Sequence, residues 1–292
     1  MSETTIAELA LRLLEGDLVP YLGPGALNGV RHCATGAKMP ADSDSLILAL
    51  HNGRPVAPRL MYEFSRAAMD MELKRGRNAV TRFLTDTYAQ ASWTRSPVHD
   101  WLASIKAPYI IDINRDTQMQ EAWADTPHTL IRGISRVAGT DYRFRIHVHD
   151  GNGYREVTQQ EVDPELPILF KPMGSPLPDP VYIASDADYV DYITELMGGF
   201  AIPDFLKARR RGLQYLLIGM RLNRDTERMV LADIVHAAGT PGGWALIPNP
   251  TGKERRFCKR LDIEIIEGDI DDLLAFSRDH DALKESVNTV GC

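Results

Sequence analysis

The chain has 292 residues, of which 44% are hydrophobic, and a formal net charge of −7. This composition provides enough apolar surface for a large core, while the acidic balance argues against a dedicated nucleic-acid binder and a polybasic membrane anchor. The three cysteines are far apart, no apolar stretch could span a bilayer, and the acidic N-terminus does not resemble a secretory signal. We therefore expect a cytoplasmic protein without zinc or another metal, and without contact to nucleic acid or membrane.

The first elements in the chain are a short helix over residues 4–15 and a buried strand over residues 18–22. Gly23 and Gly25 follow the strand directly. A nucleotide phosphate commonly lies at such a place, because a glycine has no Cβ to block the approach of a ligand. A tight turn without a ligand is the alternative, since the residue three after Gly25 is Asn28 and the dinucleotide-binding pattern is incomplete.

The next part of the chain differs in character from the first strand. Residues 28–58 are rich in Gly, Pro, Asp and Ala and predict a long loop with one short helix, and residues 58–90 show apolar spacing typical of two antiparallel helices. Ser96 and a proline after it predict the start of another helix. We predict that residues 28–96 form an inserted loop and helical module within a single domain that spans residues 1–292.

Strands and helices alternate over the remaining chain. Strands are predicted at 107–114, 166–171, 213–219, 244–248 and 261–266, and helices around 127–137 and at 186–197, 203–211, 225–238 and 269–278. Residues 142–149 alternate in polarity and lead into an Asp-Gly-Asn-Gly turn, which indicates a β-hairpin. The alternation predicts an α/β fold with a doubly wound, mostly parallel, Rossmann-like sheet.

Ligands of such sheets bind beyond the carboxyl ends of the strands, so the polar and glycine residues at these ends are the candidates for a site. They are Gly23, Gly25, Asn114, Asp116, Lys171, Gly174, Ser175, Gly219, Arg221 and Asn249. His147 and His149, on one face of the hairpin, could ligate a metal, but packed or solvated histidines are the favoured interpretation.

In chain order, these strand ends resemble the motifs of the SIR2-like (sirtuin-related) family, in its bacterial branch. Residues 21–27 are similar to the opening Gly-Ala-Gly-x-Ser loop of the family, residues 110–116 to its Thr-x-Asn-x-Asp motif, and residues 170–175 to its Lys-Leu-His-Gly-Ser motif. Residues 182–192 are similar to the segment that follows this motif. Residues 216–222 with Asp225 are similar to the Gly-x-Ser-x-x-Asp motif, and residues 245–249 to a late strand near the adenosine ribose. The resemblance covers nearly the whole chain and implies a SIR2/DHS-like fold that binds NAD or ADP-ribose.

The resemblance also implies roles for individual residues. Asn114 and Asp116 would be the catalytic residues on the ribose and nicotinamide side. The cofactor-binding residues would be Gly23, Gly25, Ala26, Asn114, Asp116, Gly174, Ser175, Gly219, Arg221 and Asn249. Among these, Arg221 would either bind a phosphate or fill the pocket against an acidic neighbour.

Four positions depart from the family pattern. Met173 stands at the catalytic histidine position, and a thioether cannot take a proton at physiological pH. Pro24 lacks a backbone N–H, Leu27 replaces a serine, and Arg221 replaces another. The zinc-binding cysteines of deacylating members are absent.

These departures lead to three hypotheses. The first is a nucleotide-binding pseudoenzyme without deacylase activity. The second is an NAD hydrolase in which another base, such as His128 or His147, replaces the missing histidine. The third is a scaffold or regulatory protein with a closed pocket that binds a protein partner or a second copy of the chain.

Overall fold

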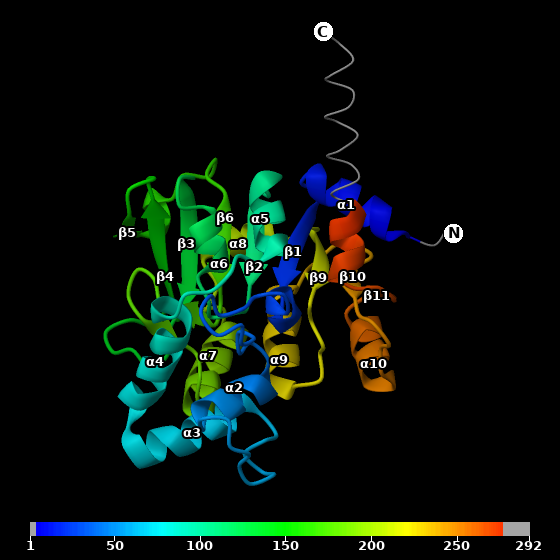
Figure 1. Ribbon diagram of the computed structural model, residues 1–292. Helices are drawn as coiled ribbons and strands as arrows, with labels where there is room; N and C mark the ends of the chain where they lie inside the picture. The colour runs from blue at the N-terminus through cyan, green and yellow to red at the C-terminus, as the bar shows by residue number, and fades with distance from the viewer. Residues whose placement is uncertain (1–3, 277–292) are drawn as a thin grey trace.

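The computed structural model describes residues 4–276, which contain a central nine-stranded sheet (Figure 1). Its strands in chain order are β1 (Leu18–Leu22), β2 (Tyr109–Asp112), β3 (His128–Gly133), β4 (Phe144–His149), β5 (Tyr154–Val157), β6 (Ile168–Lys171), β9 (Gln214–Ile218), β10 (Gly243–Leu246) and β11 (Ile263–Ile266). They lie in the order β11-β10-β9-β1-β2-β6-β3-β4-β5. Only the pairs β3–β4 and β4–β5 are antiparallel, so the predicted α/β fold with a mostly parallel, doubly wound sheet is confirmed.

Helices cover both faces of the sheet, and others lie beyond the strand ends. In chain order the helices are α1 (Ile6–Leu14), η1 (Pro24–Leu27), α2 (Ser43–Leu50), α3 (Phe64–Arg75), α4 (Arg77–Thr85), η2 (Asp86–Gln90), α5 (Pro97–Ser104), α6 (Gln118–Ala122), η3 (Gln159–Glu161), α7 (Asp186–Gly198), α8 (Asp204–Arg209), α9 (Asp225–Ile234) and α10 (Gly252–Arg260). The helix predicted over 269–278 begins at Ile270, and its last positions lie outside the described residues. A separate two-stranded sheet pairs β7 (Gly174–Ser175) with β8 (Val181–Tyr182).

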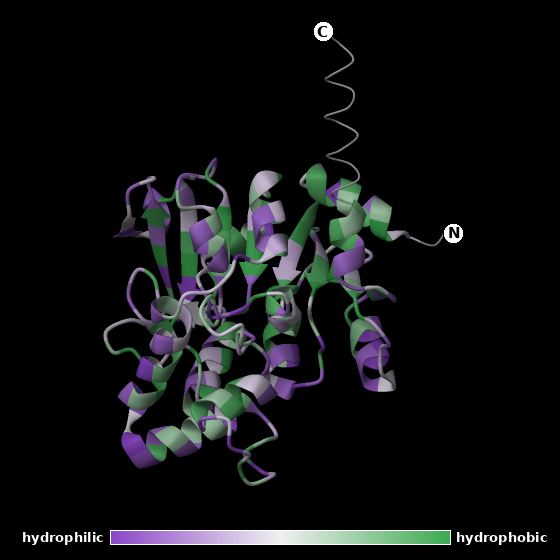
Figure 2. Cartoon of the chain, viewed as in Figure 1, coloured by the Kyte–Doolittle hydropathy of each residue, from purple (hydrophilic) through white to green (hydrophobic). Residues whose placement is uncertain are grey.

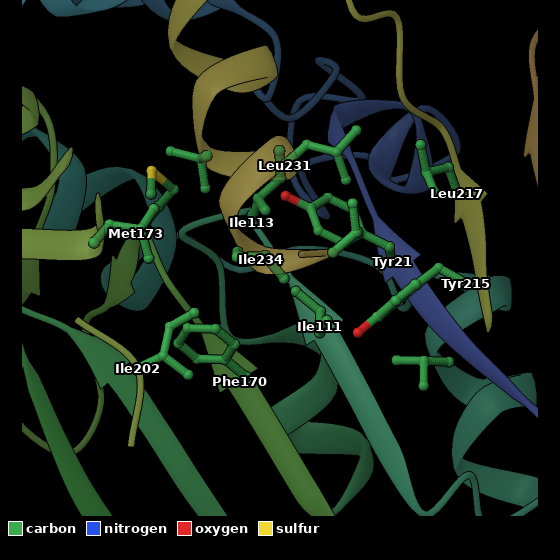
Figure 3. Packing of buried hydrophobic residues seen from close by; sticks show 14 of the residues in the cluster. Tyr21, Ile111, Ile113, Phe170, Met173, Ile202, Tyr215, Leu217, Leu231 and Ile234 are labelled. Carbon is green, nitrogen blue, oxygen red and sulfur yellow. The ribbon is translucent and has the colours of Figure 1, made fainter. Parts of the chain in front are cut away.

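The sheet and the helices on its two faces form three layers, and an apolar cluster lies between the sheet and each layer of helices. On one face α7, α8 and α9 pack on side chains such as Tyr21, Ile111 and Phe170 (Figure 3). On the other face α1 and α5 pack on residues such as Leu22 and Leu216. Central strands therefore point apolar side chains to both faces, which is why their sequences are continuous apolar runs rather than alternating ones. In Figure 2, hydrophobic residues are frequent in the central strands, whereas α10 is mainly hydrophilic.

The segment between β1 and β2 forms a cluster of its own. Its helices α2, α3 and α4 lie beyond the carboxyl end of β1 (Figure 1). Leu46, Phe64 and Leu84 belong to their shared apolar cluster, together with Tyr182 from β8. The apolar spacing along residues 58–90 thus reflects packing between these helices rather than a cofactor site.

One predicted element is wrong. The helix predicted around 127–137 is the strand β3, buried along its whole length between β6 and β4. Pairing with β6 and β4 decides the conformation of this segment. This arrangement requires a glycine at position 133, because a Cβ on Gly133 would lie 1.9 Å from the carbonyl oxygen of Pro172. The short helix α6 was not predicted either.

The order of the strands reverses at β1. From β1 the chain builds one half of the sheet through β2 to β6, and it then crosses back to place β9 on the other side of β1. The carboxyl ends of β1 and β9 therefore lie side by side at a topological switch point, which is the place where α/β sheets bind ligands.

Candidate functional site

The loops that follow β1 and β9 pack backbone against backbone at the switch point. Gly23 N donates to Ile218 O and Gly25 N donates to Gly219 O, each at 2.9 Å. A Cβ on Gly25 would lie 2.7 Å from Gly219 Cα, and one on Gly219 would lie 2.5 Å from Ala26 N. These glycines are therefore required for the two loops to approach each other.

The same contacts use the N–H groups of the first loop. Besides Gly23 and Gly25, Ala26 N donates to Gly23 O at 3.0 Å, and Pro24 has no N–H to offer. The loop thus presents a close-packed backbone surface to a ligand, while residues 23–26 hold no unused N–H for a phosphate. Any donor to a phosphate at this point must therefore come from outside residues 23–26.

Replacing Gly219 by alanine is expected to destabilise the fold more than replacing Gly36. Both have a left-handed backbone, with φ of +73° and +70°, but a Cβ on Gly36 would meet no atom within 4 Å. The close contact of Gly219 with Ala26 should add about 1–3 kcal/mol to the shared backbone strain. Urea unfolding of both variants measures the difference, and equal destabilisation would contradict the requirement for a close approach.

A cleft of about 390 Å³ opens at the switch point. Its walls come from the loops after β1, β9 and β10, from the start of α2, α5 and α9, and from residues 269–274. The lining residues are Pro24, Gly25, Ala26, Asn28, Gly29, Asp42, Ser43, Asp44, Pro97, Val98, Gly219, Met220, Arg221, Asn223, Arg224, Glu227, Leu246, Pro248, Asp269, Ile270, Asp271 and Leu274. The cleft is large enough to hold part of a nucleotide.

The predicted site residues divide into two groups. Gly25, Ala26, Gly219 and Arg221 line this cleft, and Asn114 lines a smaller pocket beside it. The structure does not bring the others to either space: Gly23, Asp116, Gly174, Ser175 and Asn249. Ser175 instead donates from Oγ to Leu177 O at 2.7 Å, and Asn249 is exposed on its own turn.

Two arginines supply the positive charge of the cleft, and each has an acidic neighbour. Arg221 Nε lies 3.5 Å from Glu254 Oε1, and its Nη1 donates to Pro248 O at 3.1 Å. Arg224 Nη2 lies 2.8 Å from Asp44 Oδ1. The Arg221 side chain is 49% exposed, so its guanidinium can contact both Glu254 and a ligand in the cleft.

The smaller pocket has a volume of about 50 Å³ and shares Pro24, Ser43, Arg224 and Glu227 with the main cleft. Asn114 reaches it from the end of β2. Its Nδ2 donates to Gly23 O and to Asp112 Oδ1, each at 2.9 Å. Both amide hydrogens are therefore used, which leaves Oδ1 to accept a hydrogen bond on the pocket side.

Behind Asn114 lies a fully buried polar cluster, in which the candidate Lys171 meets Asp112 and His99, two residues that sequence reasoning missed. Lys171 Nζ contacts Asp112 Oδ2 at 2.6 Å, and His99 Nε2 lies 3.8 Å from the same oxygen. Burial raises the pKa of Asp112, but Lys171 and His99 outweigh it and hold this pKa well below its ordinary value. The only sequence signals were the aspartate and the lysine that end two neighbouring parallel strands.

Asp116 belongs to this cluster rather than to the pocket. Its Oδ1 accepts from Gln118 N at 2.7 Å, while Oδ2 has no hydrogen-bond partner in the described part of the chain. Burial raises the pKa of Asp116, against the opposing charge of Lys171. His99, Asp112 and Asp116 place ligand atoms within 4.8 Å of one another and could hold a metal, although Lys171 already supplies a cation to Asp112.

Comparison with protein families gives a match over the second part of the chain. A family model described as a SIR2-like domain matches residues 108–266, which is more than half of the chain. The chain belongs to the SIR2-like family. Membership indicates NAD-related binding at the level of the family. Comparison with curated proteins gives no match. Among residues 4–276, no helix is both long and apolar enough to cross a membrane.

In this SIR2-like chain, Met173 lines the smaller pocket and is otherwise packed in the apolar cluster with Ile113 and Phe170 (Figure 3). The candidate replacement bases His128 and His147 lie on β3 and β4, and neither lines the cleft or the pocket. Burial lowers the pKa of each to about 4. Among residues 4–276, no histidine lines the cleft or the smaller pocket.

Proposed function

We propose that this SIR2-like protein binds NAD, ADP-ribose or a related nucleotide in the cleft between the ends of β1 and β9. The observation that carries the proposal is the position of the cleft, which opens where the strand order reverses. Deacylation is not part of the proposal, because Met173 cannot act as a base.

The lining suits the parts of a nucleotide. Val98, Leu246 and Leu274 offer apolar contacts to a base, and the carboxylate of Asp42 can accept from ribose hydroxyls. Arg221 offers a guanidinium to a phosphate, which its weak contact with Glu254 does not saturate. A scaffold with a closed pocket is less favoured, since the cleft is open and ligand-sized.

Calorimetric titration with NAD and with ADP-ribose tests this proposal. We expect binding of at least one of them, weakened about tenfold in Arg221→Gln through loss of a charge-assisted hydrogen bond. Arg155→Gln, which removes an exposed arginine on β5 far from the cleft, should bind like the unmodified protein. The absence of heat with either nucleotide at millimolar concentration would refute the proposal.

A further inference from the structure

Glu227 occupies the junction between the main cleft and the smaller pocket. It lies in the first turn of α9, directly after the loop of Gly219, and its side chain lines both spaces. Asn114 and Met173 line the smaller pocket with it. Glu227 therefore offers a carboxylate to the pocket in which Met173 supplies no proton acceptor.

The carboxylate of Glu227 is free for chemistry. Within residues 4–276 it accepts no hydrogen bond and forms no ion pair at contact distance. The neighbouring Glu63 is different, because its Oε1 accepts from Thr226 N at 3.1 Å and from Thr226 Oγ1 at 3.0 Å. Two adjacent carboxyl groups with such different environments are typical of acid–base sites.

The charged groups around Glu227 favour a proton-accepting role near neutral pH. Burial raises the pKa of Glu227 to about 7. Arg224 on its own helix and Arg115 after β2 oppose this rise, whereas Glu63 before α3 and Asp42 before α2 add to it. A carboxyl group is most effective as a general base when its pKa lies close to the working pH.

We propose that Glu227 is the general base for hydrolysis of the N-glycosidic bond between nicotinamide and ribose at the junction of the main cleft and the smaller pocket. The inference rests on the proposed binding of NAD. Glu227 takes a proton from water as the water oxygen bonds to C1′ of the ribose. The C1′–N bond breaks, and its electron pair returns to the nicotinamide ring, which leaves as a neutral molecule. The products are ADP-ribose and nicotinamide, and the proton passes from Glu227 to solvent.

Asn114, which follows the carboxyl end of β2, complements this role. Its amide hydrogens hold Gly23 and Asp112, so Oδ1 is the atom that can orient a water or a ribose hydroxyl. The pair thus combines an oriented acceptor with a base, which is the minimum needed to activate water beside a developing oxocarbenium ion.

The test is nicotinamide release from NAD by the full chain and by Glu227→Gln between about pH 5 and 9. We expect release by the unmodified protein with a rate that rises through a pKa of about 7. Glu227→Gln should lower kcat by about 10²–10⁴-fold and remove this pH dependence. Titration of the same variant with ADP-ribose should still give binding, which also shows that it is folded.

Asp233→Asn is the matched control. Asp233 lies near the end of α9, burial raises its pKa too, and it lines neither space. This variant should keep the full rate. Binding of NAD without nicotinamide release, or Glu227→Gln with an unchanged rate and pH profile, would overturn the role of Glu227 and leave the binding proposal intact. Failure to bind either nucleotide would overturn both.

Discussion

Replacing Lys171 by methionine is expected to lower the free energy of unfolding by about 3–5 kcal/mol. Lys171 and Asp112 are both fully buried, and their charged atoms lie 2.6 Å apart. Without the cation, the carboxylate of Asp112 would remain in a medium of low dielectric constant with only His99 and Asn114 beside it. Urea unfolding at about pH 7 measures the loss.

Two comparisons separate charge pairing from packing. The double variant Lys171→Met with Asp112→Asn removes both charges and keeps an oxygen that accepts from Asn114. It should recover most of the lost stability, because no buried charge then remains without a partner. Lys74→Met breaks the surface ion pair with Asp70, where the lysine is 66% exposed, and should cost less than about 1 kcal/mol. Similar losses in Lys171→Met and Lys74→Met would show that the buried pair has no special importance.

Acidification is expected to destabilise the fold through His128 by about 3 kcal/mol between neutral pH and pH 4. Burial lowers the pKa of His128 from 6.5 to about 4. The folded protein holds this ring neutral, with Nδ1 against Thr126 O at 2.7 Å and Nε2 against the Tyr154 hydroxyl at 2.9 Å. Below about pH 6.5 the unfolded chain binds a proton that the folded chain excludes, so stability falls until about pH 4.

The difference between the unmodified protein and His128→Gln isolates this effect. Glu227 acts in the opposite sense, since its pKa is raised to about 7 and its folded form loses stability as the pH rises towards that value. Subtracting the two stability curves removes the contribution of Glu227. We expect the difference to change by about 3 kcal/mol between pH 7 and pH 4. A difference that does not vary with pH would contradict the neutral, buried state of His128.

Local patterns in the sequence predicted most of the helices and strands of the fold. Apolar runs such as residues 18–22 and 214–218 must be buried on both faces, and the helices between them follow from apolar spacing. The strand β3 shows where this reasoning fails. His128 and Arg132 are polar but fully buried, because Tyr154 and Asp179 hydrogen-bond to them from other parts of the chain.

The position of the cleft was also predictable, because glycines after two parallel strands meet at one edge of the sheet. The role of individual residues was not. Ser175 donates to Leu177 O instead, Asn249 is exposed, and Asp116 belongs to a buried cluster behind the pocket. A position after a strand specifies the edge of the sheet but not the direction of a side chain.

The sequence by itself predicted the α/β fold of the SIR2-like family and the edge of the sheet at which the cleft opens. Only the tertiary structure brought Glu227 and Asn114 to the lining of one pocket and placed Lys171 against Asp112. The physical reason is the range of the interactions. Hydrophobic patterning acts over a few residues and is readable along the chain, whereas the pKa and the contacts of a buried carboxyl group depend on elements that are far apart in the sequence.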